Sequence, residues 1–202
     1  MTDKQLAMQC IRMLEKYIND AKNLPNNNTK NLRLDGADMT AWKQTYYPQL
    51  VANGKIRDGV FFENPLKNRN YGIGQDGECT KYEYVQFLWS AYKFVMGDFP
   101  ADSDALKYIK DCIKMLEPCA SSFENHGTET AAVHSLNPAD KKKWVNEIYP
   151  KLSKSGLIPD GTFFGDIKAD PRLGVGNDGE FTGEELCHFL FRLYRQAYII
   201  LN

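Results

Sequence analysis

The chain has 202 residues, of which 43% are hydrophobic and 12% aromatic. This composition provides enough apolar material for packed cores and excludes a disordered chain. The formal net charge of −1 gives no electrostatic argument for nucleic acid or an anionic membrane, because both favour basic patches. We therefore expect one large or two small globular domains and no nucleic-acid partner.

The first predicted element is an amphipathic helix in "KQLAMQCIRMLEKYINDAK". Its apolar side chains recur at three- and four-residue spacing, at Leu6, Cys10, Met13, Leu14 and Tyr17. The segment lacks the apolar core and cleavage site of a secretory signal. No apolar run reaches the ~18 residues that would span a membrane. We expect no signal peptide, no membrane insertion, and a cytoplasmic or virion-associated protein.

A second helix is predicted to follow a polar loop. Asp35 is the expected N-cap, and Trp42 and Leu50 mark its buried face. Pro48 lies inside this helix and predicts a kink or a break there, and Gly54 is the expected residue after its C-cap. The dipeptide Asp58-Gly59 in "GKIRDGVFF" then predicts a turn with a short extended piece.

A glycine-rich loop, "GIGQDGECTKYE" (72–83), leads to a closing helix. Thr80 with Glu83 forms a predicted capping box, in which the hydroxyl accepts from a later N–H and the carboxylate reaches back. The closing helix "TKYEYVQFLWSAYKFVM" carries a core stripe that includes Val85, Leu88 and Tyr92.

The sequence then repeats itself at an offset of 102 positions without insertion or deletion. Cys10, Ile11, Met13, Leu14 and Glu15 align with Cys112, Ile113, Met115, Leu116 and Glu117. "DGVFF" aligns with "DGTFF", and the loop aligns with "GVGNDGEFTGEE" (174–185). In the second copy Ser103 or Asp104 is expected to cap the first helix, and Asn137, followed by Pro138, the second. The joint lies in "GDFPADSD", which divides the chain into units 1–98 and 99–202.

These patterns predict a mainly α fold of two tandem three-helix units with short extended and turn segments. A faithful duplication favours two like-folded units related by a pseudo-twofold. The five cysteines are odd in number and lack CxxC spacing, which favours reduced thiols over disulfides or a zinc site.

Three interpretations of the glycine loop stand side by side. A calcium loop would need side-chain oxygen ligands at its first and third positions. Those positions hold Gly72 and Gly74, or Gly174 and Gly176, which have no side-chain oxygen. A phosphate cradle would lack the P-loop lysine. The architectural interpretation, which we favour, assigns turn and cap roles to Gly72, Gly74, Asp76, Gly77, Thr80, Glu83 and to Gly174, Gly176, Asp178, Gly179, Thr182, Glu185. We expect no metal and no cofactor.

Trp42 followed by Leu50, "NGKI", "DGVFF" and "TKYEYVQFL" resembles the S-layer homology repeat, as do Trp144, "LSKSGLIPDGTFF" and "TGEELCHFL". The resemblance covers about 40–60 residues of each unit. It implies a noncatalytic module that binds cell-wall polysaccharide or anchors proteins to an envelope. The family's arginine after the threonine, which grips an anionic glycan, is Lys81 in one unit and Gly183 in the other.

Our leading hypothesis is a noncatalytic binding or assembly protein, structural or phage-virion-associated, whose partner is a protein or a glycan, as a homo-oligomer or larger assembly. An envelope-polysaccharide anchor acting near Lys81 and Arg172 is the first alternative, and a small cell-wall hydrolase the second. Candidate ligand-binding residues are Lys81, Tyr71, Arg172, Trp42 and Trp144, although the two tryptophans suit a core better. His188 and Glu184 are expected to form a surface pair on the closing helix of the second unit.

Overall fold

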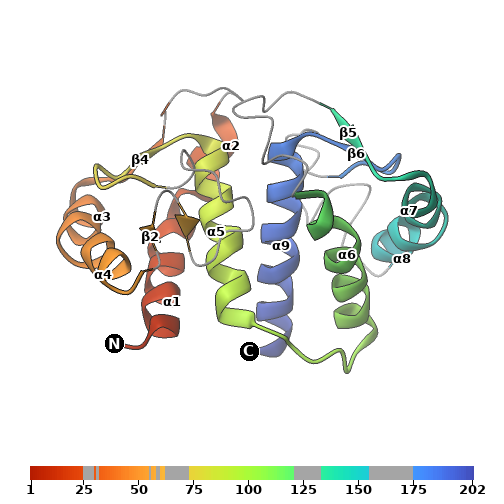
Figure 1. The fold of residues 1–202 in the computed structure, drawn as a ribbon, viewed down its shortest axis with the longest axis horizontal. Helices are drawn as coiled ribbons and strands as arrows, with labels where there is room; N and C mark the ends of the chain where they lie inside the picture. Colours follow the sequence, from red (N-terminus) through yellow and green to blue (C-terminus); the bar gives the residue numbers. More distant parts are fainter. Residues whose placement is uncertain are drawn as a thin grey trace. The chain divides into compact units, whose positions relative to one another are not determined.

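Helices make up most of the described residues in the computed structural model (Figure 1). The structure describes residues 1–24, 30, 32–54, 56–57, 60–61, 73–120, 133–154 and 175–202. The predicted mainly α fold is confirmed. Contacts within the chain separate two compact units, Met1–Gly97 and Asp98–Asn202.

Unit 1 is built from helical segments and very short strands. In chain order these are α1 (Asp3–Leu14), the 3₁₀ turn η1 (Glu15–Tyr17), α2 (Ile18–Asn23), β1 (Leu32–Arg33), α3 (Gly36–Ala41), the π-helical segment η2 (Trp42–Tyr46), α4 (Tyr47–Ala52), β2 (Ile56–Arg57), β3 (Val60–Phe61), β4 (Glu78–Cys79) and α5 (Lys81–Met96). Unit 2 repeats most of this order as α6 (Asp104–Ala120), β5 (His134–Ser135), α7 (Pro138–Lys143), the π-helical segment η4 (Trp144–Ile148), α8 (Tyr149–Lys154), β6 (Glu180–Phe181) and α9 (Gly183–Leu201).

The core of each unit lies between its first and last helices. Figure 1 shows α1 beside α5 in unit 1 and α6 beside α9 in unit 2. The predicted stripe of α1 is buried, and Leu6, Cys10 and Leu14 have no exposed surface. Each fully buried leucine of this kind contributes about 1.5–3 kcal/mol to folding. Hydrogen bonds from Tyr92 to Glu15 (2.6 Å) and from Tyr194 to Glu117 (2.8 Å) tie the same two helices in both units.

Short antiparallel strand pairs close each unit. Leu32 pairs with Cys79 in unit 1, and His134 pairs with Phe181 in unit 2. The sequence did not predict β1, because two residues are too few to show a strand period. Ile56 pairs with Phe61 in a further antiparallel pair, which confirms the short extended piece, while Asp58-Gly59 itself lies outside the described residues.

The second helix of each unit is one helical run with a π-helical segment inside it. In unit 1 the run continues from Gly36 to Ala52, and η2 ends one residue before Tyr47-Pro48. Proline has no N–H to donate to the preceding turn, so a wider π turn at this place lets the helix continue. The predicted break at Pro48 is therefore wrong, because the helical run is continuous and its π-helical segment begins at Trp42, before the proline.

The predicted capping pattern is confirmed at most positions. Thr80 with Glu83 and Thr182 with Glu185 form complete capping boxes. The side chain of Asn137 accepts from two backbone N–H groups, and Ser103 caps α6. Gly54 follows the C-cap of α4 with a φ of 67°.

Asp35 is the exception to this pattern. It occupies the N-cap position of α3, but its side chain makes no capping hydrogen bond. Its backbone N–H donates instead to the Tyr17 hydroxyl. The predicted side-chain cap is therefore absent, and the bond to Tyr17 of η1 connects the start of α3 to the first helical run.

The glycine loop acts as a joint between the second and last helices of its unit. The Trp42 indole Nε1–H donates to the carbonyl of Gly74 (2.8 Å), and Trp144 donates in the same way to Gly176 (2.7 Å). Asp76 accepts the backbone N–H of Glu78, so its carboxylate supports the turn. Gly77 and Gly179 adopt φ values of 76° and 74°, a region that favours glycine. These contacts favour the architectural interpretation of the loop.

We predict that Trp144→Phe lowers the free energy of unfolding by about 1–3 kcal/mol, because the half-buried Gly176 carbonyl loses the donor that the fully buried indole supplies. Urea denaturation followed by far-UV circular dichroism measures this change. Val145→Ala, at an exposed neighbour on the same segment, should change the value by less than about 0.5 kcal/mol. Equal stability of the two variants would contradict the role of the indole bond.

Candidate functional site

The predicted ligand-binding residues are not displayed together on a surface. Trp42 and Trp144 are fully buried and pack edge-on against Phe87 and Phe189, with ring centroids 5.7 and 5.5 Å apart. Their indole N–H groups bind the loop carbonyls, so they serve as core residues and do not stack on a ligand. Tyr71, Arg172, Gly72 and Gly174 lie outside the described residues.

Lys81 is buried as well, with 1% of its surface exposed. Its Nζ donates to the backbone carbonyl of Leu24 at 3.5 Å. It stands in the first turn of α5, whose side chains from Lys81 to Tyr92 are all buried. A lysine in this setting binds a backbone carbonyl and is not displayed at the surface for an external glycan.

His188 and Glu184 do not form the surface pair that the sequence suggested. Both lie in the buried part of α9, with 3% and 1% exposure, and the His188 Nε2 is 3.9 Å from a Glu184 oxygen. Arg192 continues this polar row one turn later and is also buried. The expectation was wrong because α9 is buried on nearly every side along Gly183–Tyr194, so spacing alone did not identify its exposed face.

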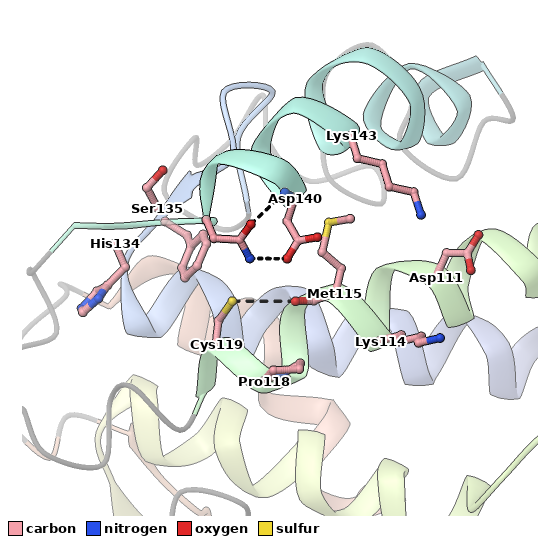
Figure 2. Close-up of a pocket in the computed structure, with 11 residues that line it drawn as sticks. Asp111, Lys114, Met115, Pro118, Cys119, His134, Ser135, Asp140 and Lys143 are labelled. Atoms are coloured by element: carbon pink, nitrogen blue, oxygen red, sulfur yellow. Dashed lines mark hydrogen bonds between the residues drawn. The ribbon is translucent and has the colours of Figure 1, made fainter.

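A groove of about 590 Å³ lies in unit 2 (Figure 2). It runs between α6 on one side and β5 with α7 on the other. We call it the α6–α7 groove. It is lined by Asp111, Lys114, Met115, Pro118, Cys119, His134, Ser135, Asn137, Asp140, Lys143 and Phe181. Figure 2 shows Asp111, Lys114 and Lys143 at one end, His134 and Ser135 at the other, and Cys119 and Asp140 between them.

Local structure explains how these side chains meet. Pro138 and the Asn137 cap begin α7 immediately after β5, so Asp140 lies in the first turn and faces α6. Asn137 accepts from the N–H groups of Ala139 and Asp140, and its amide nitrogen donates to the Asp140 carboxylate. The Asp140 carboxylate is thereby held at the groove in one orientation.

Unit 1 has the matching groove, between α1 and α3, and there it is smaller. The remaining space is about 260 Å³. Lys16 Nζ donates to both oxygens of Asp38, at 2.9 and 3.1 Å. The Tyr17 hydroxyl donates to Asp38 at 3.0 Å and accepts from the Asp35 N–H at 2.8 Å. Asp38, the counterpart of Asp140, is thus satisfied by two side chains from the end of the first helical run.

Two neighbouring substitutions remove the side chains that bind the aspartate in unit 1. Where unit 1 has Lys16 and Tyr17, unit 2 has Pro118 and Cys119. Neither residue reaches Asp140 with a donor comparable to an ammonium or a phenol: within the described part of the chain, the Cys119 Sγ contacts the Met115 carbonyl at 3.7 Å. The larger cavity of unit 2 follows from the loss of the phenol ring and the lysine chain.

The chemistry of the groove does not favour a thiol nucleophile. Burial, and second the nearby Asp140 carboxylate, raise the pKa of the Cys119 thiol. Thiolate formation needs a lowered pKa, from a neighbouring cation or a helix N-terminus. Burial raises the pKa of Cys10 to about 12 and raises the pKa values of Cys79 and Cys112 as well. The groove therefore offers hydrogen-bonding and ionic groups for binding.

A second hollow, of about 530 Å³, lies at the surface beside the glycine loop of unit 1. It is lined by Lys43, Gly74, Gln75 and Asp76. The Gly74 carbonyl and the Asp76 carboxylate already hold the turn together. Unit 2 has Val145 in place of Lys43, so this hollow has no matching chemistry in the other copy.

Comparisons with known protein families, curated proteins and solved structures find no match. Among the residues that the structure describes, no three histidine, cysteine or acidic side chains gather as metal ligands would. No helix of that part of the chain has the length and apolarity needed to cross a membrane.

Sequence reasoning missed the α6–α7 groove, although one signal was readable. The matched run from Cys10 to Glu15 and from Cys112 to Glu117 ends directly before the pair that differs, Lys16-Tyr17 against Pro118-Cys119. Two large polar residues of unit 1 are replaced by two smaller ones in unit 2, while the aspartates further along each unit are unchanged. Such a change indicates that a side-chain contact of unit 1 is lost in unit 2. Only the packing of α6 near α7 shows which aspartate was left.

We predict that Cys119 reacts first of the five cysteines with a thiol reagent in the native protein, because the other four are buried. Near pH 7 its rate should be below that of free cysteine, since the raised pKa leaves less thiolate. The rate should keep rising with pH after free cysteine has reached its plateau. Asp140→Asn removes the repelling charge and should speed the reaction. A Cys119 that outpaces free cysteine at pH 7 would contradict this assignment.

Proposed function

We propose that the protein is a noncatalytic binding or assembly protein made of two S-layer-homology-like units, and that it binds a protein partner through the α6–α7 groove. The observation that carries the proposal is the difference between the two copies of this groove. One copy is filled by the chain's own Lys16 and Tyr17, and the other is open around an aspartate in the same position.

The physical argument rests on what unit 2 lacks. In unit 1 the Tyr17 hydroxyl and the Lys16 ammonium both donate to Asp38; the Tyr17 bond is partly buried, whereas the Lys16 ammonium is exposed and its ion pair is screened by solvent. Unit 2 retains the aspartate and adds an asparagine that orients it, but Pro118 and Cys119 stand at the positions of these two donors. A polar groove that is ordered but less stabilised by internal hydrogen bonds than its counterpart is typical of a binding site.

Two features weigh against the other hypotheses. The polysaccharide anchor relied on Lys81 and Arg172; Lys81 is buried and bound to a backbone carbonyl, which gives that alternative no support, and Arg172 lies outside the described residues. The hydrolase would need an activated nucleophile or a free carboxylate pair. The Cys119 thiol has a raised pKa, and the Glu83 and Glu185 carboxylates are bound to the caps of their own helices.

A random peptide library, selected against the full-length protein and counter-selected against Cys119→Tyr, tests the proposal. The tyrosine restores the unit 1 side chain and should fill the groove. We expect peptides that bind the unchanged protein and bind Cys119→Tyr at least about tenfold more weakly, because the added ring occupies their site. Val145→Ala, at an exposed position outside the groove lining, serves as a control and should retain binding within about threefold.

Insoluble cell wall in a co-sedimentation assay provides the parallel test of the glycan alternative. Peptides that bind both variants equally, or a library from which none is enriched, would contradict a protein-binding groove. Retention on cell wall that Cys119→Tyr leaves unchanged would move the function to another surface.

A further inference from the structure

We infer that the α6–α7 groove recognises a partner segment that presents a phenol hydroxyl beside an ammonium group, as a Lys-Tyr pair does. This inference rests on the proposed function and names the chemistry of its ligand. It takes the filled groove of unit 1 as the template for the open groove of unit 2.

The template is fully specified by hydrogen bonds within unit 1. The Lys16 ammonium lies 2.9 and 3.1 Å from the two oxygens of Asp38. The Tyr17 hydroxyl lies 3.0 Å from one of these oxygens and accepts the Asp35 N–H. The Tyr17 ring is buried with 6% exposure, so the phenol is a packed element of the groove. One carboxylate therefore accepts hydrogen bonds from an ammonium group and a phenol at the same time.

Unit 2 retains the carboxylate that accepts these hydrogen bonds. Asp140 stands where Asp38 stands, and Asn137 fixes one of its oxygens. The Cys119 thiol and Pro118 leave the volume that the phenol and the lysine chain occupy in unit 1. A ring entering this space meets apolar surface from Met115, Pro118 and Phe181, and its hydroxyl comes within reach of Asp140.

The charges that line the groove favour a ligand that is recognised by the geometry of its hydrogen bonds. Asp111 replaces Gln9 and adds a carboxylate, while Lys143 replaces Ala41 and adds an ammonium. With Lys114 and Asp140 the formal charges of the four side chains cancel. Net attraction of cations or anions is therefore small, and discrimination comes from the paired hydrogen bonds to Asp140, which require the hydroxyl and the ammonium in adjacent positions.

The test uses the blocked dipeptide N-acetyl-Lys-Tyr-amide as probe, titrated into the full-length protein and followed by two-dimensional NMR. A ligand of this size should bind with a Kd on the order of 1 mM. We expect shifts at Cys119, Ser135 and Asp140, and binding too weak to measure in Cys119→Tyr. The Lys-Phe and norleucine-Tyr analogues, which lack the hydroxyl or the ammonium, should bind about tenfold more weakly.

Asp140→Asn should weaken Lys-Tyr binding to about the level of the two analogues, because it removes the charge that both donors address. Circular dichroism of this variant and of Cys119→Tyr checks that each remains folded. Equal binding of Lys-Tyr and Lys-Phe, or binding that survives Cys119→Tyr, would overturn the inference.

The outcomes separate this inference from the proposed function. If library peptides depend on the open groove while Lys-Tyr binds no better than its analogues, the ligand assignment is wrong and the protein-binding function stands. If neither the library nor the dipeptide distinguishes the unchanged protein from Cys119→Tyr, both are wrong.

Discussion

The hydrogen bond from a buried tryptophan to a glycine carbonyl holds each unit in its arrangement. In unit 1 the Trp42 indole reaches Gly74, and in unit 2 the Trp144 indole reaches Gly176. The bond connects the middle helix to the loop that ends in the capping box of the last helix. Because it satisfies a buried donor and a backbone acceptor at once, the direction of α5 and α9 from their loops depends on it.

A framework fixed in this way can tolerate change at its periphery, and the two units show where change occurred. Both keep the tryptophan bond, the capping box and the tyrosine bond between first and last helices. They differ at the end of the first helix, where Lys16 and Tyr17 bind Asp38 but Pro118 and Cys119 leave Asp140 accessible. One copy shows the groove closed by internal contacts, and the other shows it ready for external ones. Because the chain is duplicated, the groove of unit 1 can be compared directly with the groove of unit 2.

The sequence predicted the features that depend on local spacing. Helix periodicity, the capping boxes and Gly54 after its helix each arise from residues a few positions apart. It did not predict the β1–β4 pairing or the burial of Lys81, His188 and Glu184, because these depend on which helices become central. The α6–α7 groove was missed for the same reason. Its residues come from segments about 20 to 70 positions apart, and only their packing brings Cys119 close to Asp140.

The reciprocal exchange in unit 1 is the most direct test of the claim that the two grooves are equivalent. Lys16→Pro combined with Tyr17→Cys gives unit 1 the end of α6 and removes the two side chains that donate to Asp38. Two-dimensional NMR titration with N-acetyl-Lys-Tyr-amide, at a temperature where circular dichroism shows the variant folded, follows the backbone signals of Asp38 and Asp140 separately. We predict shifts at Asp140 alone in the unchanged protein and at both aspartates in the double variant. A folded double variant in which only Asp140 shifts would contradict the equivalence of the two grooves.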